Sequence, residues 1–254
     1  MSSKLFTVAI GSSYLVNLHP VLLPARMAWA TADMKAAIAG LQASLKAAGG
    51  ELILSDLFRS YDMQLQAHLD YVNKRKTANS PPPGGSFHEA GRAFDLDLSR
   101  TKVKLAKLWE LAAEQGLVPI ISKPDASKDE AWHFEHRGSH QLVYDYYQAG
   151  KGTNFDVPYK AAAASAILAI GVRVDRFADS QAMALIQSGL IRLGKQIGNM
   201  DGQIGPKTRK ALDSLNVDGS DEAAALTAVE HALQAKFPQE FFDTTAPDAS
   251  LIHA

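Results

Sequence analysis

Between residues 31 and 58 the apolar positions change from a helical to an extended spacing. Thr31–Ala48 carries apolar side chains three or four residues apart, and Gly49–Gly50 follows it. This pattern predicts an amphipathic helix that ends at the glycine pair. Glu51–Phe58 is a short, mainly apolar run, which predicts a buried strand that delivers Arg59 at its end. The helical apolar positions are Met34, Ile38, Leu41 and Leu45.

The spacing of apolar residues predicts further helices and strands between residues 60 and 135. Alternating residues after Ala93 predict a strand with Asp95 on one face and Phe94 on the other. Ser80–Gly85 is rich in proline and glycine, which predicts a loop ahead of that strand. Helices packed on one side of a largely antiparallel sheet would form an α+β domain. The remaining predicted elements are helices at Ser60–Thr77 and Thr101–Gln115 and strands at Val118–Ile121 and Ala131–Glu135.

The amino-acid composition of the chain changes near residue 150. Gly150–Pro158 is rich in glycine and polar residues, and the chain beyond it is alanine-rich with helical spacing. We therefore predict a first domain over residues 1–150, a linker over residues 151–158 and an all-α helical-bundle domain over residues 159–254. The last dozen residues are expected to form a loose tail.

Composition narrows the functional classes. The 254 residues carry a net charge of −1 with acidic and basic residues interspersed, so no binding of nucleic acid is expected. The chain has no cysteine, which excludes disulfides and thiol chemistry. No run reaches the roughly 18–20 apolar residues of a membrane helix, and Ala161–Gly171 is too short. We expect a monomer that does not insert into membranes.

Two segments roughly forty residues apart carry the candidate chemistry. The first is Ser86–Asp95, with His88 and Asp95, and the second is Glu130–His133. Together they supply two imidazoles, one carboxylate and a further glutamate, Glu130. A catalytic zinc site uses three such protein ligands, keeps one position open for water and places a base nearby. The two segments therefore favour metal-dependent hydrolysis.

The spacing places these groups on strands and loops rather than on one helix. His88 and Asp95 are seven residues apart, whereas ligands on one helical face lie three or four residues apart. Gly91 gives the backbone freedom to bend between them. His133 is expected on a second short strand, so the site would form where the separate segments converge.

Neighbouring groups offer alternatives. Glu89 is the second candidate for the base, although a neighbour of His88 is expected to point elsewhere. Asp97 is an alternative ligand, and a bond to nearby backbone is the favoured interpretation for it. Trp132 is expected to form a packing wall. We expect His68, His136 and His140 to be exposed to solvent. For His136 and His140 the alternative is a position behind the metal ligands, in contact with them.

The order Ser-x-His-x-x-Gly-x-Ala-x-Asp followed by Glu-x-Trp-His resembles a known family. This is the zinc D-Ala-D-Ala carboxypeptidase and L,D-endopeptidase family, with VanX- and VanY-like enzymes and several phage endolysins. The resemblance covers roughly residues 20–150 and implies the DD-peptidase or hedgehog-like fold. It implies that His88, Asp95 and His133 bind Zn²⁺ and that Glu130 is the general base.

The family also has an arginine in a Tyr/Phe-Arg-Ser segment that is followed by a glutamine, which here are Arg59 and Gln64. The resemblance implies a catalytic or substrate-binding role for Arg59 and a substrate-binding role for Gln64. A guanidinium could stabilise the oxyanion or grip a substrate carboxylate, and the sequence leaves both roles open. Ser86 could bind substrate or hold its loop, and both roles stay open too.

Residues 178–216 resemble the peptidoglycan-binding domain, a small three-helix bundle that commonly accompanies cell-wall hydrolases. The core is Asp-Gly-x-x-Gly-Pro-x-Thr at residues 201–208. Asp201–Gly202 predicts a turn, and Pro206 suits the first position of a helix that includes Thr208–Leu215. The alternative is a helical bundle that merely packs on the first domain.

The two resemblances imply a zinc-dependent peptidoglycan peptidase that cleaves stem peptides or cross-links, such as a phage endolysin. Residues 1–23 lack a signal-peptide pattern, so we expect synthesis in the cytoplasm and action on the wall after holin release or dedicated export. The alternatives are a D-Ala-D-Ala carboxypeptidase, a secreted bacterial effector and a non-catalytic wall-binding module. The presence of Glu130 argues against the last alternative.

Overall fold

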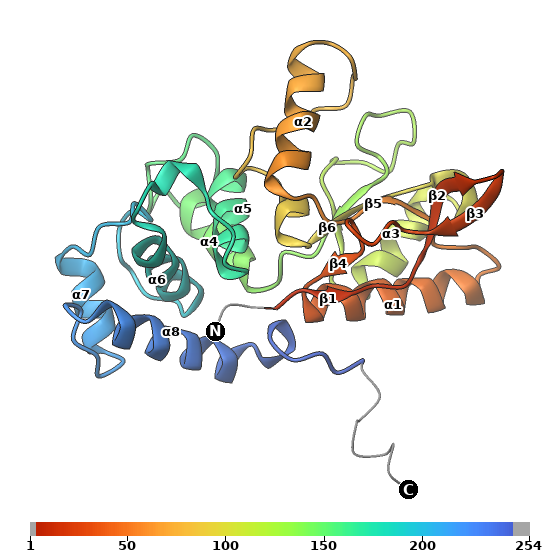
Figure 1. The fold of residues 1–254 in the computed structure, drawn as a ribbon. Helices are drawn as coiled ribbons and strands as arrows, with labels where there is room; N and C mark the ends of the chain where they lie inside the picture. Colours follow the sequence, from red (N-terminus) through yellow and green to blue (C-terminus); the bar gives the residue numbers. More distant parts are fainter. Residues whose placement is uncertain (1–3, 246–254) are drawn as a thin grey trace, which may run out of the picture.

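The computed structural model describes residues 4–245 and places a small mixed region of strands and helices beside an all-helical region (Figure 1). The strands are β1 (Phe6–Thr7), β2 (Gly11–Val16), β3 (His19–Leu22), β4 (Trp29–Ala30), β5 (Leu54–Asp56), β6 (Ala93–Leu96), β7 (Val118–Pro119) and β8 (His133–Glu135). The helices are α1 (Ala32–Ala47), α2 (Tyr61–Val72), α3 (Leu105–Ala113), α4 (Gln141–Gln148), α5 (Pro158–Ala169), α6 (Gln181–Arg192), α7 (Pro206–Asp213) and α8 (Glu222–Lys236). Short 3₁₀ helices are η1 (Phe87–Ala90), η2 (Leu98–Arg100), η3 (Gly138–His140), η4 (Asp175–Phe177) and η5 (Pro238–Glu240).

The main sheet has six strands in the order β3-β2-β5-β6-β8-β7. Strands β2 and β5 run parallel, and the other neighbouring strands are antiparallel. The register of β6 and β8 sets Asp95 directly opposite His133. The predicted α+β class with a mainly antiparallel sheet is therefore confirmed.

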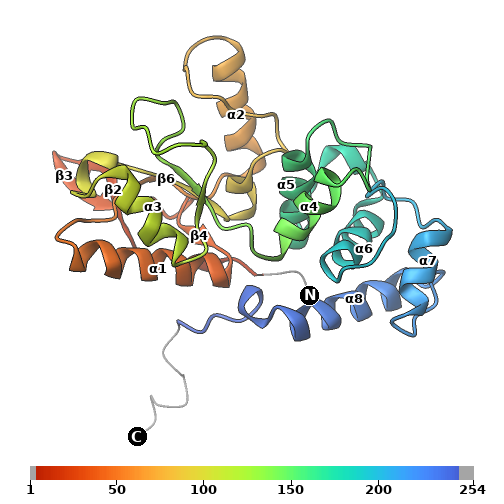
Figure 2. The same ribbon diagram turned by 180° about the vertical axis from the view of Figure 1, so that it is seen from behind.

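Helices α1 and α3 lie together on one side of the sheet in both views (Figures 1 and 2). The predicted apolar positions of α1 are buried, and they share a core with Leu54 of β5, Phe94 of β6 and Phe134 of β8. The side chain of Asp95 lies on the other face of β6, as its alternation with Phe94 predicts. Burial of one strand face thereby fixes the side from which Asp95 approaches the site.

Several predicted elements are shorter in the structure. Of the strand predicted at Glu51–Phe58, only β5 is a strand in the structure, and of the helix predicted at Thr101–Gln115, only α3 is helical. Strand β6 ends before Asp97, because the Asp97 carboxylate accepts a hydrogen bond from the Ser99 amide at 2.9 Å and begins η2. The sequence analysis did not predict β1–β4. The turn between β2 and β3 uses Asn17 and Leu18 at φ values of 50° and 65°, without the glycine that usually marks such a turn.

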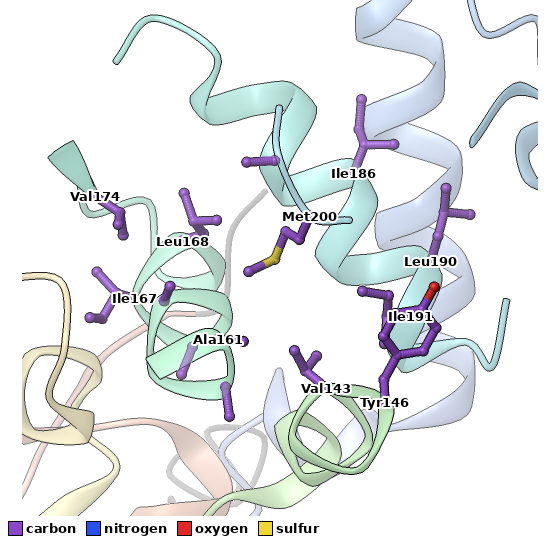
Figure 3. Packing of buried hydrophobic residues seen from close by; sticks show 14 of the residues in the cluster. Val143, Tyr146, Ala161, Ile167, Leu168, Val174, Ile186, Leu190, Ile191 and Met200 are labelled. Carbon is purple, nitrogen blue, oxygen red and sulfur yellow. The ribbon is translucent and has the colours of Figure 1, made fainter. Parts of the chain in front are cut away.

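Helices α4–α8 form a second core (Figure 3). Val143 of α4, Ile167 of α5 and Ile191 of α6 are buried in this cluster. Residues 161–169 of α5 are all buried, and most are alanines, so other backbones can approach this helix closely. The same core includes Phe87, Ala90 and Ala93 from the first motif. The helical region thus packs directly on the segment that carries His88.

The predicted linker packs against the helical region. Asn154 donates to the Met200 carbonyl at 2.7 Å, and the Thr153 amide donates to Asn199 at 2.7 Å. Gly152 is buried beside Tyr147. The division of the chain at residues 151–158 stays a prediction, and the described contacts give this segment a fixed place.

The peptidoglycan-binding-like core has the local structure that its sequence predicts. Pro206 is at the start of α7, and Gly202 has a φ of 77°. The buried Gln187 of α6 accepts hydrogen bonds from the amides of Asp201 and Gly202 at 2.9 and 2.7 Å. Gln187 therefore stabilises the turn before α7.

A buried ion network joins the two cores. Arg92 donates to Asp33 of α1 at 2.8 Å, and Arg192 of α6 pairs with Glu240 of η5 at 2.5 Å. Glu240 also accepts from the Ser139 amide at 2.6 Å and lies 3.7 Å from Arg92. All four charged side chains are at least 96% buried. Charges in such surroundings are tolerated only with partners, so the network fixes η5 and the end of α6 against α1.

The prediction that the last dozen residues form a loose tail is wrong at its first residue, Asp243. Asp243 pairs with Lys35 of α1 at 2.7 Å. Residues 246–254, the rest of that prediction, lie outside the described residues. Within residues 4–245, the helices are too short or too polar to cross a membrane.

Glu240→Gln should lower the free energy of unfolding by about 3–5 kcal/mol, because it leaves Arg192 buried without its counter-charge. The matched control is Glu110→Gln, which removes an exposed partner of Lys107 and should change stability by less than about 1 kcal/mol. Urea unfolding of the full chain measures both variants. Equal losses would contradict the assigned role of the network.

Asp33→Asn should reveal a pH-dependent contribution. Burial alone would raise the pKa of the Asp33 carboxyl, but Arg92 holds this pKa below its usual value. A carboxyl with a lowered pKa in the folded state stabilises the protein above the pKa of the unfolded chain, and this contribution disappears in acid. The stability difference between wild type and Asp33→Asn should therefore shrink as pH falls below about 4. Urea unfolding of both proteins at a series of pH values measures this difference, and a difference that does not change with pH would contradict the role assigned to Asp33.

Candidate metal centre and active site

His88 is held in η1 by a local hydrogen-bond arrangement. The Ser86 hydroxyl accepts from the His88 amide at 3.3 Å, and the Glu89 carboxylate accepts from the Ser86 amide at 3.2 Å. Gly91 ends η1 in the left-handed region at a φ of 61°. The Nδ1 atom of His88 lies 2.8 Å from the Leu57 carbonyl oxygen, so its Nε2 atom faces the centre of the site. The imidazole thus has one nitrogen committed to backbone and one directed at Asp95.

Asp95 and His133 complete a three-residue cluster. On paired strands, the Nδ1 atom of His133 lies 2.9 Å from Asp95 Oδ1. The Nε2 atom of His88 lies 3.5 Å from the same oxygen. One ligand atom from each of the three residues falls within 4.8 Å of the others, a grouping that could hold a metal ion.

The donor set and its charges suit a divalent cation. Two imidazole nitrogens and a carboxylate oxygen are preferred zinc ligands. Although burial opposes the charged form, the hydrogen bonds to Asp95 and Glu135 raise the pKa of His133 to about 10. Burial would raise the pKa of Asp95, yet His88 and His133 hold it well below its usual value. Both pKa shifts show that the acidic groups around His133 favour positive charge at the centre of the cluster.

Glu130 lies at the edge of this cluster. Its Oε2 atom is 4.0 Å from His133 Nδ1, and its side chain is 18% exposed. Burial is the main reason that the pKa of its carboxyl lies above the usual value, and the charge of Asp95 adds to the shift. A carboxylate with a raised pKa beside a candidate metal site is suited to proton transfer.

Arg59 is fixed beside Asp95 by three side chains. Its Nε atom donates to Asp56 at 2.6 Å, and its Nη1 atom donates to Gln64 at 3.2 Å. Its Nη2 atom lies 3.5 Å from Asp95 Oδ2, the carboxylate oxygen that does not face the histidines. The Arg59 side chain is 12% exposed, so a guanidinium reaches the site with little freedom to move.

Gln64 and Ser86 have clear structural contacts. Gln64 has no exposed surface, and its amide donates to the Pro81 carbonyl at 2.7 Å while it accepts from Arg59. The Ser86 hydroxyl caps η1 and also lines the cleft over the site. Substrate binding by these two residues stays a prediction; their visible contacts hold Arg59 and the loop that precedes His88.

The two acidic alternatives point away from the cluster. Glu89 is 1% exposed, and its carboxylate accepts from the Gly84 amide at 2.9 Å. Burial is the main cause that raises its pKa to about 7. Asp97 bonds to the Ser99 amide, so the favoured interpretation of this residue is confirmed. These contacts give Glu89 and Asp97 structural roles.

Exposure was the wrong expectation for all three additional histidines, because His140 is buried and His68 and His136 are partly buried. His140 is 1% exposed, and its Nδ1 atom lies 2.8 Å from Ser165 Oγ. The half-buried His68 has its Nδ1 atom 2.8 Å from the Ser80 carbonyl oxygen. The partly buried His136 lies 3.3 Å from Asp33, in the ion network. The contacts come from residues distant in the chain, which periodicity alone does not show.

A cleft of about 350 Å³ opens over the cluster. Trp132 forms part of its wall, as expected, and the loop after α2 and the start of α5 form other parts. The cleft therefore includes residues from both sides of the predicted linker. Its lining comprises Arg59, Lys76, Ala78, Asn79, Pro81, Gly85, Ser86, His88, Asp95, Ile120, Glu130, Trp132, His133, Val157, Tyr159 and Lys160.

The sequence analysis missed two groups beside His133. Glu135 is fully buried, and its Oε1 atom lies 3.3 Å from His133 Nε2. Its position two residues after His133 on a strand was the available signal, because such residues share a face. Tyr159 lines the cleft from the start of α5 and had no sequence signal, because it falls in the predicted helical domain.

Comparisons with known proteins agree with the motifs. The VanY family model, described as D-alanyl-D-alanine carboxypeptidase, matches residues 28–139, which is less than half of the chain. The match confirms the VanY-like resemblance for this segment, which contains every member of the cluster. No curated protein sequence matches the chain. Among solved structures, the LdcB LD-carboxypeptidase, described as revealing the molecular basis of peptidoglycan recognition, is similar at 17% identity and a TM-score of 0.41, over 52% of this chain and 67% of that chain.

Gly91→Ala should destabilise the protein more than Gly194→Ala. Both glycines have positive φ values, so a Cβ atom at either position costs about 1–2 kcal/mol. At Gly91 it would also lie 2.9 Å from Leu5 and 3.0 Å from the Trp29 carbonyl oxygen, whereas nothing lies within 4 Å at Gly194. We expect about 1–3 kcal/mol of additional loss for Gly91→Ala in urea unfolding. Equal losses would show that the bend after His88 has room for a side chain.

Proposed function

We propose that this protein is a zinc-dependent peptidoglycan peptidase that cleaves stem peptides or cross-links of the bacterial cell wall. The observation that carries the proposal is the convergence of His88, Asp95 and His133 within 4.8 Å at the base of a cleft that Glu130 also lines. The VanY match over residues 28–139 supports the substrate class. In this proposal the three clustered residues hold Zn²⁺.

A zinc ion bound there would polarise the scissile carbonyl and lower the pKa of the attacking water. Glu130 would accept the proton of that water and transfer it to the departing amine. Burial raises the pKa of the Glu130 carboxyl, which makes this carboxylate a stronger base than an exposed glutamate and favours uptake of the proton. Glu130 therefore has the role of general base and then general acid.

Arg59 has two possible tasks in this reaction, and its contacts favour one of them. Its guanidinium is held by Asp56, Gln64 and Asp95 and is largely buried. A cation with so little freedom is suited to stabilising the charge that develops on a carbonyl oxygen close to the ligands. We assign Arg59 to the oxyanion. Gripping a substrate carboxylate is the alternative.

The second candidate reaction is removal of a terminal D-alanine, because the matching family is described as a D-alanyl-D-alanine carboxypeptidase. The two reactions give different products from purified cell wall. New amino groups within stems or cross-links indicate an endopeptidase, and free D-alanine indicates a carboxypeptidase. Mass spectrometry of the fragments from defined muropeptides distinguishes them.

We further propose that the helical region contributes to binding of the wall. The support is the Asp-Gly-x-x-Gly-Pro-x-Thr core, whose turn and helix have the predicted local structure. Attachment to an insoluble polymer raises the local concentration of substrate for the nearby cleft. A phage endolysin that reaches the wall after holin release is the proposed context, and an exported bacterial effector is the alternative.

Glu130→Gln should retain Zn²⁺ while hydrolysis of purified peptidoglycan falls by about 10²–10⁴-fold, because the amide cannot accept the proton of water. A chelator should abolish wild-type hydrolysis, and added Zn²⁺ should restore it. Release of soluble muropeptides measures activity, and equilibrium dialysis measures bound zinc.

The control for this experiment is Glu110→Gln, an exposed position on α3 that should keep full activity. Wild-type turnover by Glu130→Gln would overturn the assignment of the base. Hydrolysis that persists unchanged in chelator would overturn metal dependence.

A further inference from the structure

The two ring nitrogens of His133 face different carboxylates. Its Nδ1 atom lies 2.9 Å from Asp95 in the cluster, and its Nε2 atom lies 3.3 Å from Glu135 behind it. Glu135 has no exposed surface and does not line the cleft. It therefore cannot meet a substrate, and its effect on the site must pass through His133.

Glu135 is itself held by Arg137. The Nε atom of Arg137 donates to its second carboxylate oxygen at 2.8 Å, and the Arg137 guanidinium stacks on the Tyr144 ring at 4.9 Å. The Tyr159 ring also faces the Arg137 guanidinium, 6.0 Å from the ring centroid. Burial, and next the charge of Glu135, raise the pKa of Tyr159. The carboxylate is thereby fixed in one orientation toward the imidazole.

Tyr159 links the helical region to both ligand-bearing segments. It lies in the first turn of α5, and its ring packs edge-on against Phe87 of η1 with centroids 5.6 Å apart. Phe87 is fully buried and directly precedes His88. One side chain of α5 thus packs against Arg137, which holds Glu135, and against the neighbour of His88.

We propose that Glu135 is a positioning residue for the metal ligand His133, and that Tyr159 of α5 in turn positions Glu135. The inference rests on the proposed function to the extent that the cluster binds a metal ion. It deepens that function, because it makes the start of the helical region part of the metal centre rather than a separate anchor.

The chemistry follows from the two nitrogens. A neutral imidazole carries one N–H, and the other nitrogen has the lone pair that can bind a metal. An ionised carboxylate only accepts hydrogen bonds, so Glu135 requires the proton on Nε2 and leaves the lone pair of Nδ1 toward Asp95 and His88. Hydrogen-bond partners of this kind orient a ligand and increase its basicity, and their loss typically weakens metal binding about 10–100-fold.

The test measures Zn²⁺ affinity of the full chain by competition with a chromophoric chelator. Glu135→Gln should weaken binding about 10–100-fold. Tyr159→Phe removes the hydroxyl that the charge of Glu135 influences and should weaken binding about two- to tenfold. The matched controls are Glu51→Gln, another arginine-bound glutamate that does not line the cleft, and Tyr147→Phe, another hydrogen-bonded tyrosine of the helical region. Both controls should keep the wild-type affinity.

A second measurement separates positioning from general damage. In zinc-loaded protein with ¹⁵N-labelled histidine, His133 should show a slowly exchanging Nε2 proton that moves in Tyr159→Phe and broadens in Glu135→Gln. If Glu135→Gln unfolds, Tyr159→Phe still provides the affinity and the spectrum. Affinity and spectrum unchanged in the folded variants would overturn the inference while leaving the proposed function intact. A wild-type protein that binds no Zn²⁺ would overturn both.

Discussion

The pairing of β6 with β8 is the constraint on which the candidate site depends. Their register sets Asp95 opposite His133, and the apolar face of β6 buries Phe94 on the side away from the cluster. A slip of one residue would exchange these faces and remove the aspartate from both histidines. The sheet core therefore selects the geometry of the site, and the loops add His88 and Glu130 to it.

Local sequence patterns predicted those features that depend on neighbours in the chain. The helix over residues 32–47, the loop before His88 and the alternation around Asp95 follow from spacing, glycine and proline. The hydrogen bond between His88 and the Leu57 carbonyl cannot be predicted from such patterns, because it joins segments that lie close together only in the folded sheet. The burial of His140 was missed for the same reason. Its partner Ser165 belongs to a helix that no local pattern connects with it.

The helical region is joined to the sheet region by two unlike contacts. One is apolar, where Phe87, Ala90 and Ala93 enter the core of α4–α6. The other is ionic, where Arg92 and Glu240 meet with their partners. Since Arg92 alternates along the chain with these apolar residues, one short segment uses both kinds of contact. The same segment contains His88, so the packing of the helices and the position of a candidate ligand are physically linked.

The ion network also orders the events of biosynthesis. Asp33, Arg92, Ser139 and Arg192 leave the ribosome before Glu240, the last member, is translated. Until then Arg192 lacks its acidic partner, although Arg92 already has Asp33, and a nascent chain that collapsed early would enclose Arg192 at a high cost in free energy. Co-translational folding should therefore leave this part of the chain open to water until Glu240 has emerged, because the compact arrangement requires this last acidic member of the network.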